Sequence, residues 1–140
     1  MRCIFIIDTN VVVAGLLTGD AASPVARILD GMLGAAFPFA LSEALLAEYR
    51  KVLVRPTLRK LHGLKVTEVE TILTDLVQNA VILKQAAAPP APDPGDQFLW
   101  DLLVARNELV LVTGDKRLLQ DKGMAGRVIS PRAFMAGRGP

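Results

Sequence analysis

Residues Cys3–Ile7, Cys-Ile-Phe-Ile-Ile, form a continuous apolar run, and the polar residues Asp8, Thr9 and Asn10 follow at once. A strand that is apolar on both faces is typical of the centre of a parallel sheet covered by helices on each side. In an open parallel sheet, the residues just beyond the carboxyl ends of the strands line the ligand crevice. The start of the chain therefore predicts an α/β fold, with Asp8 at the edge of the sheet where such folds bind ligands.

Strand-like and helix-like segments alternate along the rest of the chain. Ser23 followed by Pro24 predicts the start of a helix, because Ser is a good N-cap and Pro suits the first helical position. Thr67 and Glu70 have the spacing of a capping box. Residues 85–95 are rich in Ala and Pro and predict an extended loop. Further strands are expected at 37–41, 80–83, 109–112 and 127–129, and helices at 24–33, 42–54 (ended by Pro56), 67–79, 96–106 and 116–120.

This alternation implies right-handed crossovers between parallel strands. We therefore predict a three-layer α/β/α sandwich with a mainly parallel sheet of four to five strands, formed by a single domain over residues 1–140. No apolar run approaches the ~18 residues that span a bilayer, and the N-terminus does not have the pattern of a signal peptide. A cytoplasmic protein without a membrane partner is expected. The single cysteine, Cys3, is expected to fill space in the core.

Four acidic residues lie at predicted strand ends or in the helices that follow. Asp8 and Asp115 come after apolar β-like runs, whereas Glu48 lies within a helical segment and Asp96 lies at the start of one. Carboxylates gathered at one sheet edge repel one another unless a cation lies between them, and Mg²⁺ or Mn²⁺ prefers oxygen ligands. The residues alone also allow Asp8, Asp96 and Asp115 to be helix caps and Glu48 to be a surface residue. A metal-dependent phosphodiesterase is the first hypothesis.

Basic residues are concentrated between Arg50 and Lys65, a stretch that contains no acidic residue, although the net charge of the chain is only +2. This segment is either a solvated face or a phosphate-binding patch beside the acidic pocket. His62 lies in the same segment without a second His or Cys nearby, so we expect a solvent-facing residue and not a metal ligand. Tyr49 and Trp100 are expected in the core or at its edge. The candidate RNA-binding residues are Arg50, Arg55, Arg59 and Lys60.

Three stretches together resemble the PIN domain family. They are Ile-Asp-Thr-Asn-Val at the first strand end, Ser-Glu-Ala-Leu-Leu-Ala-Glu-Tyr in the second helix, and Leu-Val-Thr-Gly-Asp-Lys-Arg-Leu-Leu near the end. The resemblance covers nearly the whole chain and is closest to small, stand-alone prokaryotic PIN proteins assigned to toxin–antitoxin systems. It implies an Mg²⁺- or Mn²⁺-dependent ribonuclease in which the catalytic and metal-binding residues are Asp8, Glu48, Asp96 and Asp115.

The same resemblance implies that Asn10 and Thr113 help to hold the site. In the implied reaction, a metal-activated water hydrolyses an RNA phosphodiester, and Ser42 or Thr113 orients the water or the phosphate. The implied partners are RNA and a small antitoxin protein, and a homodimer or larger homo-oligomer is a further expectation.

At two positions the sequence does not decide which ligands the metal site has. Many relatives carry a further acid two residues beyond Asp115, where this chain has Arg117, so a second metal would bind weakly or need the substrate phosphate. The third acid is Asp96 in our assignment, but Asp93 or Asp101 could assist it.

Three other functions compete with the ribonuclease hypothesis. They are a catalytically weak or inactive module that binds RNA or protein, a DNA-directed nuclease, and a signalling receiver-type domain. The last needs an acceptor Asp after the third strand, where this chain has Lys84-Gln85.

Overall fold

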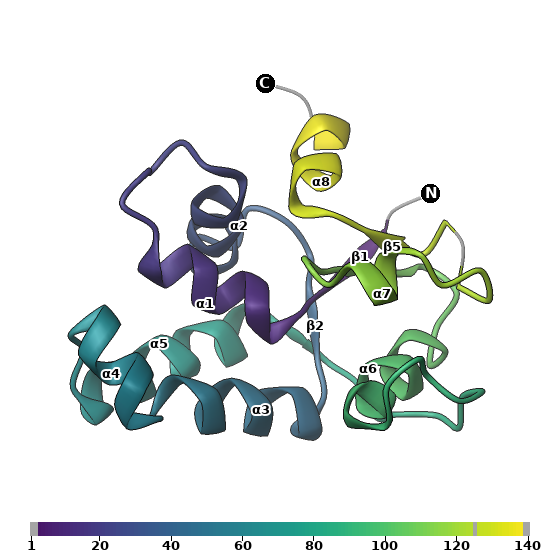
Figure 1. The fold of residues 1–140 in the computed structure, drawn as a ribbon, viewed down its shortest axis with the longest axis horizontal. Helices are drawn as coiled ribbons and strands as arrows, with labels where there is room; N and C mark the ends of the chain where they lie inside the picture. Colours follow the sequence, from purple (N-terminus) through teal and green to yellow (C-terminus); the bar gives the residue numbers. More distant parts are fainter. Residues whose placement is uncertain (1–2, 125, 139–140) are drawn as a thin grey trace.

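The computed structural model describes residues 3–124 and 126–138. Strands and helices alternate through most of this range (Figure 1), and no helix within it is both long and apolar enough to cross a membrane. The elements in chain order are β1 (Ile4–Ile7), α1 (Thr9–Leu17), α2 (Pro24–Leu33), β2 (Ala40–Leu41), α3 (Glu43–Leu53), α4 (Pro56–His62), α5 (Val66–Asn79), β3 (Val81–Ile82), the 3-10 turn η1 (Pro94–Asp96), α6 (Gln97–Leu103), β4 (Leu109–Val112), α7 (Lys116–Leu119), β5 (Val128–Ile129) and α8 (Pro131–Arg138).

All strand pairs in the described residues are parallel. Strand β4 lies between β1 and β5, with Val112 opposite both Ile7 and Ile129. Strands β2 and β3 form a second pair, and a parallel bridge between Phe5 and Phe39 joins this pair to β1. The strands therefore follow the order β3-β2-β1-β4-β5, and the carboxyl ends of β1 and β4 meet side by side.

Helices cover both faces of the sheet. Figure 1 shows α1, α2 and α8 on one side and α3, α5 and α6 on the other. The prediction of a three-layer α/β/α sandwich with a parallel sheet is confirmed. Tyr49 and Trp100 are buried, as expected, and the largest fully buried side chains are Trp100, Tyr49, Phe39, Ile6, Ile7 and Ile28.

Two of the predicted helix starts are confirmed and one is wrong. The Ser23 and Ser42 hydroxyl groups cap α2 and α3 by accepting the N–H groups of Ala26 and Leu45. The capping box does not involve Thr67 and Glu70. Helix α5 begins earlier, at Val66, so Glu68 takes the third helical position and accepts the N–H of Lys65 at 2.9 Å.

Helices α1, α4 and α8 were not predicted. In α1, the β-branched run Val11–Val13 and Gly15 have low helix propensity, and packing against α2 overcomes this. Pro56, expected only to end a helix, is also the first residue of α4, where its missing N–H costs nothing. Gly63, with φ of 70°, ends α4 in the left-handed conformation that glycine adopts readily.

Two single-residue expectations are wrong. Cys3 is exposed and is not a core residue, because the apolar run enters the sheet only at Ile4. His62 is partly buried and does not simply face solvent. Its Nδ1 accepts the N–H of Leu64, and its Nε2 lies 2.9 Å from the carbonyl oxygen of Leu53, so it ties the end of α4 to the end of α3.

The close contact of α1 and α2 depends on Gly15. A Cβ atom there would lie 2.7 Å from the carbonyl oxygen of Val25 and 3.0 Å from Cβ of Leu29. We expect Gly15→Ala to lower the free energy of unfolding by about 1–3 kcal/mol, because the overpacking outweighs the gain in helix propensity. The measurement is urea unfolding followed by circular dichroism. Gly19→Ala is the matched control, since nothing lies within 4 Å of its Cβ position, and equal midpoints for both variants would contradict the prediction.

Candidate active site

The carboxylate of Asp8 is directed by hydrogen bonds to the end of the neighbouring strand. The Asp8 N–H donates to the carbonyl oxygen of Val112 at 2.9 Å, which extends the pairing of β1 and β4 by one residue. The Asp8 side chain makes no capping bond to α1. It accepts instead from the Thr113 hydroxyl at 2.8 Å and the Asn10 amide at 3.3 Å. The capping alternative therefore does not describe this carboxylate.

Thr113 connects the two strand ends at the site. Besides donating to Asp8, its hydroxyl accepts the N–H of Asp115 at 3.0 Å and lies 3.4 Å from the Asn10 amide nitrogen. Since a hydroxyl carries a single hydrogen, Thr113 has none left with which to orient a water or a phosphate. The Gly114 N–H donates to Oδ1 of Asn10 at 3.2 Å.

One cavity of about 560 Å³ brings the four predicted acids together: Asp8 directly follows β1, Glu48 lies in α3, Asp96 ends η1 and Asp115 is the N-cap of α7. Ser42 is not in its lining, and the Ser42 hydroxyl caps α3, so the structure does not bring this predicted residue to the site. The cavity is lined by Asp8, Thr9, Asn10, Val13, Ala14, Leu17, Glu48, Val52, Arg55, Thr57, Leu58, Asp96 and Asp115.

The structure distinguishes the three acids near the proline-rich loop. Asp96 lines the cavity, and its side chain makes no capping bond to α6. Asp93 accepts the N–H of Gly95 and a hydrogen bond from Arg117. Asp101 lies outside the lining and holds the loop by accepting from Ala88 and Gln97. Asp96 is therefore the acid that faces the other three carboxylates.

Burial and neighbouring carboxylates raise the pKa of Asp8 and of Asp96. Burial is the main reason that the pKa of Asp8 rises from 3.8 to about 6; the Thr113 hydrogen bond opposes the rise, and the charges of Asp96 and Asp115 add to it. Burial, with the charges of Asp93 and Asp115, also raises the pKa of Asp96. Burial first, and then the charge of Asp8, raises the pKa of the Tyr49 hydroxyl, which donates to the carbonyl oxygen of Ile7. The four carboxylates in the described lining of the cavity outnumber its one basic residue, Arg55.

The donor atoms suit a hard divalent cation. The ionisable ligands in the lining are all carboxylates, and no His or Cys lines the cavity. The Thr9 hydroxyl is buried in the same wall and finds no hydrogen-bond partner in the described part of the chain, so it is available to a water or ligand oxygen. Among the described residues, no three or more His, Cys, Asp or Glu side chains lie close enough together to hold a metal ion. The four carboxylates line one cavity, but they do not lie together as a metal-binding cluster.

The predicted RNA-binding residues do not share one environment. Arg55 is exposed and lines the acidic cavity at the start of α4. Arg59 and Lys60 are exposed further along α4, beside a separate hollow. Arg50 instead donates to both carboxylate oxygens of Glu70, at 2.8 and 3.0 Å. Of the four predicted RNA-binding residues, Arg55 is thus the one that lines the acidic cavity, whereas Arg50 forms an ion pair with Glu70.

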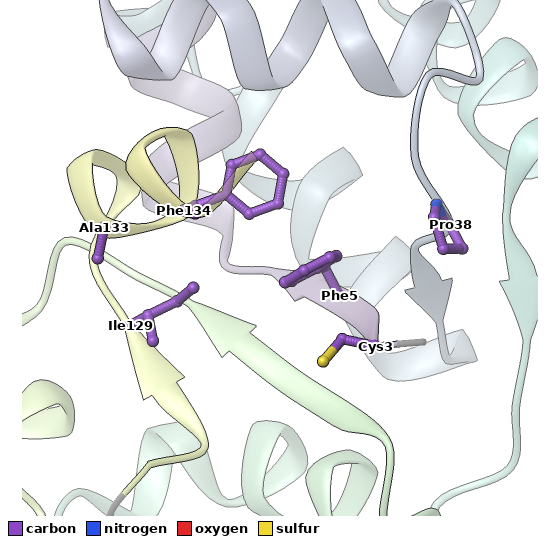
Figure 2. A pocket seen from close by; sticks show the side chains of 7 residues that line it. Cys3, Phe5, Pro38, Ile129, Ala133 and Phe134 are labelled. Carbon is purple, nitrogen blue, oxygen red and sulfur yellow. The ribbon is translucent and has the colours of Figure 1, made fainter. Parts of the chain in front are cut away.

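A second cavity, of about 530 Å³, has no carboxylate in its lining. Figure 2 shows Phe5, Ile129 and Phe134 around it, with Cys3 and Pro38 at its border. Its lining is mainly apolar, and Cys3 is the one ionisable side chain among its described lining residues.

Sequence reasoning missed part of the acidic cavity. Thr9 was given no role, and Val13 and Leu17 were not assigned to a helix. The sequence does hold a signal for these two apolar residues. Val13 and Leu17 are four positions apart in the segment that follows Asp8, and residues four apart lie on one face of a helix.

Comparison with known proteins identifies the fold and a family. The sequence model of a family described as PIN domain matches residues 5–117. No curated protein matches the chain. Among solved structures, the crystal structure of PAE2754 from Pyrobaculum aerophilum is similar, with a TM-score of 0.58 and 15% sequence identity over 96% of this chain and 88% of that chain. At this identity the similarity shows the fold alone.

Proposed function

Because this chain belongs to the PIN domain family, whose members are commonly nucleases, we propose that it is a divalent-metal-dependent endoribonuclease. The observation that carries the proposal is the gathering of Asp8, Glu48, Asp96 and Asp115 around one cavity at the carboxyl edge of the sheet. PIN domains typically bind divalent metals, and these carboxylates would hold Mg²⁺ or Mn²⁺. When bound, such an ion supplies Lewis acidity for the hydrolysis of a phosphodiester.

Residues of the chain itself prepare the site for this reaction. Thr113 and Asn10 fix the orientation of the Asp8 carboxylate. The unpartnered Thr9 hydroxyl can donate to a water or a phosphate oxygen, the role predicted for Ser42 or Thr113. Arg55 can hold a substrate phosphate at the wall of the cavity, because a guanidinium group matches phosphate geometry. No protein nucleophile is required.

The biological setting forms part of the same proposal. We infer that the protein acts in the cytoplasm as the toxin of a toxin–antitoxin pair, with a small antitoxin as its protein partner. The exposed basic residues of α4 and the side chain of Leu61, which is 67% exposed, support this by offering a mixed charged and apolar surface. Self-association is proposed as well, and light scattering on the purified protein measures it.

The test of the function is cleavage of a labelled single-stranded RNA with Mg²⁺ or Mn²⁺, with EDTA, and with EDTA followed by excess metal. We expect cleavage only when metal is free, and little cleavage of a DNA strand of the same sequence. Equal cleavage of the DNA would favour a DNA-directed nuclease. RNA binding without any cleavage would favour a binding module.

A phosphate-binding role for α4 predicts a change in salt dependence. Replacing Arg55, Arg59 and Lys60 together by Gln should flatten the log–log dependence of RNA affinity on salt by ~0.7 for each lost contact. The loss of affinity should be similar for all RNA sequences, because phosphate contacts carry no sequence information. Arg50→Gln is the matched control, since Arg50 is engaged by Glu70 and should change the slope less. An unchanged slope in the triple variant would mean that the segment is only a solvated face.

A further inference from the structure

Arg117 connects an acid of the cavity to an acid beside it. Its side chain is 64% exposed, and Nη2 donates to Oδ2 of Asp93 at 3.1 Å. Its Nε lies 3.8 Å from Oδ1 of Asp115, and its backbone N–H donates to the same oxygen at 2.9 Å. The backbone bond caps α7 and does not depend on the side chain, so the guanidinium group itself contributes the ion pair with Asp115 and the hydrogen bond to Asp93.

This arrangement limits what Asp115 can offer a metal. Oδ1 of Asp115 is engaged by Arg117, whereas Oδ2 has no hydrogen bond or ion pair within the described part of the chain, so Asp115 has one oxygen free for a cation. A carboxylate that bridges two metal ions with one oxygen on each needs both oxygens free. Because Arg117 engages Oδ1, Asp115 can bind one ion through Oδ2 but is not free to bridge two ions through both oxygens.

The charge around the cavity points the same way. Five carboxylates, the four in the lining and Asp93, face two guanidinium groups, Arg55 and Arg117, which leaves three negative charges. One divalent cation reduces this to one negative charge, whereas two would leave the site net positive. With Asp at position 117 the five carboxylates become six and the guanidinium groups fall to one, so two divalent cations would leave the same single negative charge.

We propose that the Arg117 guanidinium group restricts the acidic cavity to a single tightly bound divalent cation by neutralising charge on Asp115 and Asp93. The inference rests on the proposed metal-dependent function and deepens it. Arg117 is a positioning residue, because it acts through Asp115 and Asp93.

The test counts bound Mn²⁺ per chain by equilibrium dialysis and by electron paramagnetic resonance, without RNA. We expect one ion for the wild type, one for Arg117→Lys, which keeps the charge, and two for Arg117→Asp. Arg117→Asn removes the guanidinium group without adding a carboxylate, and should admit a second, weaker ion. Arg132→Asp is the control for charge reversal, since Arg132 is exposed on α8, an element that contributes nothing to the lining. Circular dichroism checks that each variant is folded.

The outcomes separate this inference from the proposed function. Two ions on the wild type or on Arg117→Lys, one ion on Arg117→Asp, or two on Arg132→Asp would overturn the role of Arg117 and leave the metal-dependent function standing. No ion on the wild type, together with RNA cleavage that EDTA does not affect, would overturn both.

Discussion

Asp8→Asn is expected to lower metal-dependent RNA cleavage by at least about 100-fold while the protein remains folded. Asn keeps the shape of the side chain and can still accept from Thr113 and Asn10, which hold the native carboxylate. It lacks the negative charge that a divalent cation requires. The measurement is the cleavage rate at saturating Mn²⁺, with circular dichroism as the check on folding.

The control for this variant is Asp75→Asn, which makes the same chemical change on the exposed face of α5. It should cleave RNA at the wild-type rate. Wild-type activity in Asp8→Asn would show that Asp8 is not a metal ligand. An unfolded Asp8→Asn would give the side chain a structural role, although its carboxylate makes no cap to α1.

The second large effect is that Asp8→Asn is expected to be more stable than the wild type in metal-free buffer. The pKa of Asp8 is raised from 3.8 to about 6 in the folded protein, so the folded state binds this proton more tightly than the unfolded state. The contribution of Asp8 to the free energy of unfolding therefore falls as pH rises from about 4 through about 6, and changes no further above that range. The difference corresponds to about 3 kcal/mol as an upper figure. Asp8→Asn escapes this loss because Asn does not ionise.

Chemical denaturation of both proteins between pH 3.5 and 8, with EDTA present, measures the difference. The variant should be the more stable protein above about pH 6, and the two should converge near pH 3.5. Added Mg²⁺ should stabilise the wild type at neutral pH and leave the variant unchanged, since a ligand stabilises the state that binds it. Parallel stability curves for the two proteins would contradict the raised pKa.

Strands were easier to predict than helices in this chain. Strand β4 has the predicted limits Leu109–Val112, because a short apolar run between polar residues has few other ways to be buried. Strands β2 and β3 occupy only two residues each of the predicted 37–41 and 80–83. Helix α1 was missed because its stability comes from contact with α2, and tertiary contacts are invisible to local propensity.

The acidic cavity was predictable in outline, and its hydrogen bonds were not. Strand ends meet at one edge of a parallel sheet, so Asp8 and Asp115 could be placed together from their positions after apolar runs. The pairing of Arg117 with Asp93 joins residues 24 positions apart, and nothing in their spacing signals it. Ser42 had two available roles, and only the structure shows that its hydroxyl caps α3.

The hydrogen bond between Thr113 and Asp8 closes a loop of 105 residues, and this separation has a consequence for synthesis on the ribosome. The first acid of the cavity is synthesised well before strand β4, which supplies its neighbour. A nascent chain that stops before Leu109 carries Asp8, Glu48 and Asp96 without the strand that gathers them. Any activity of this cavity therefore begins only after strand β4 has been synthesised and has left the exit tunnel.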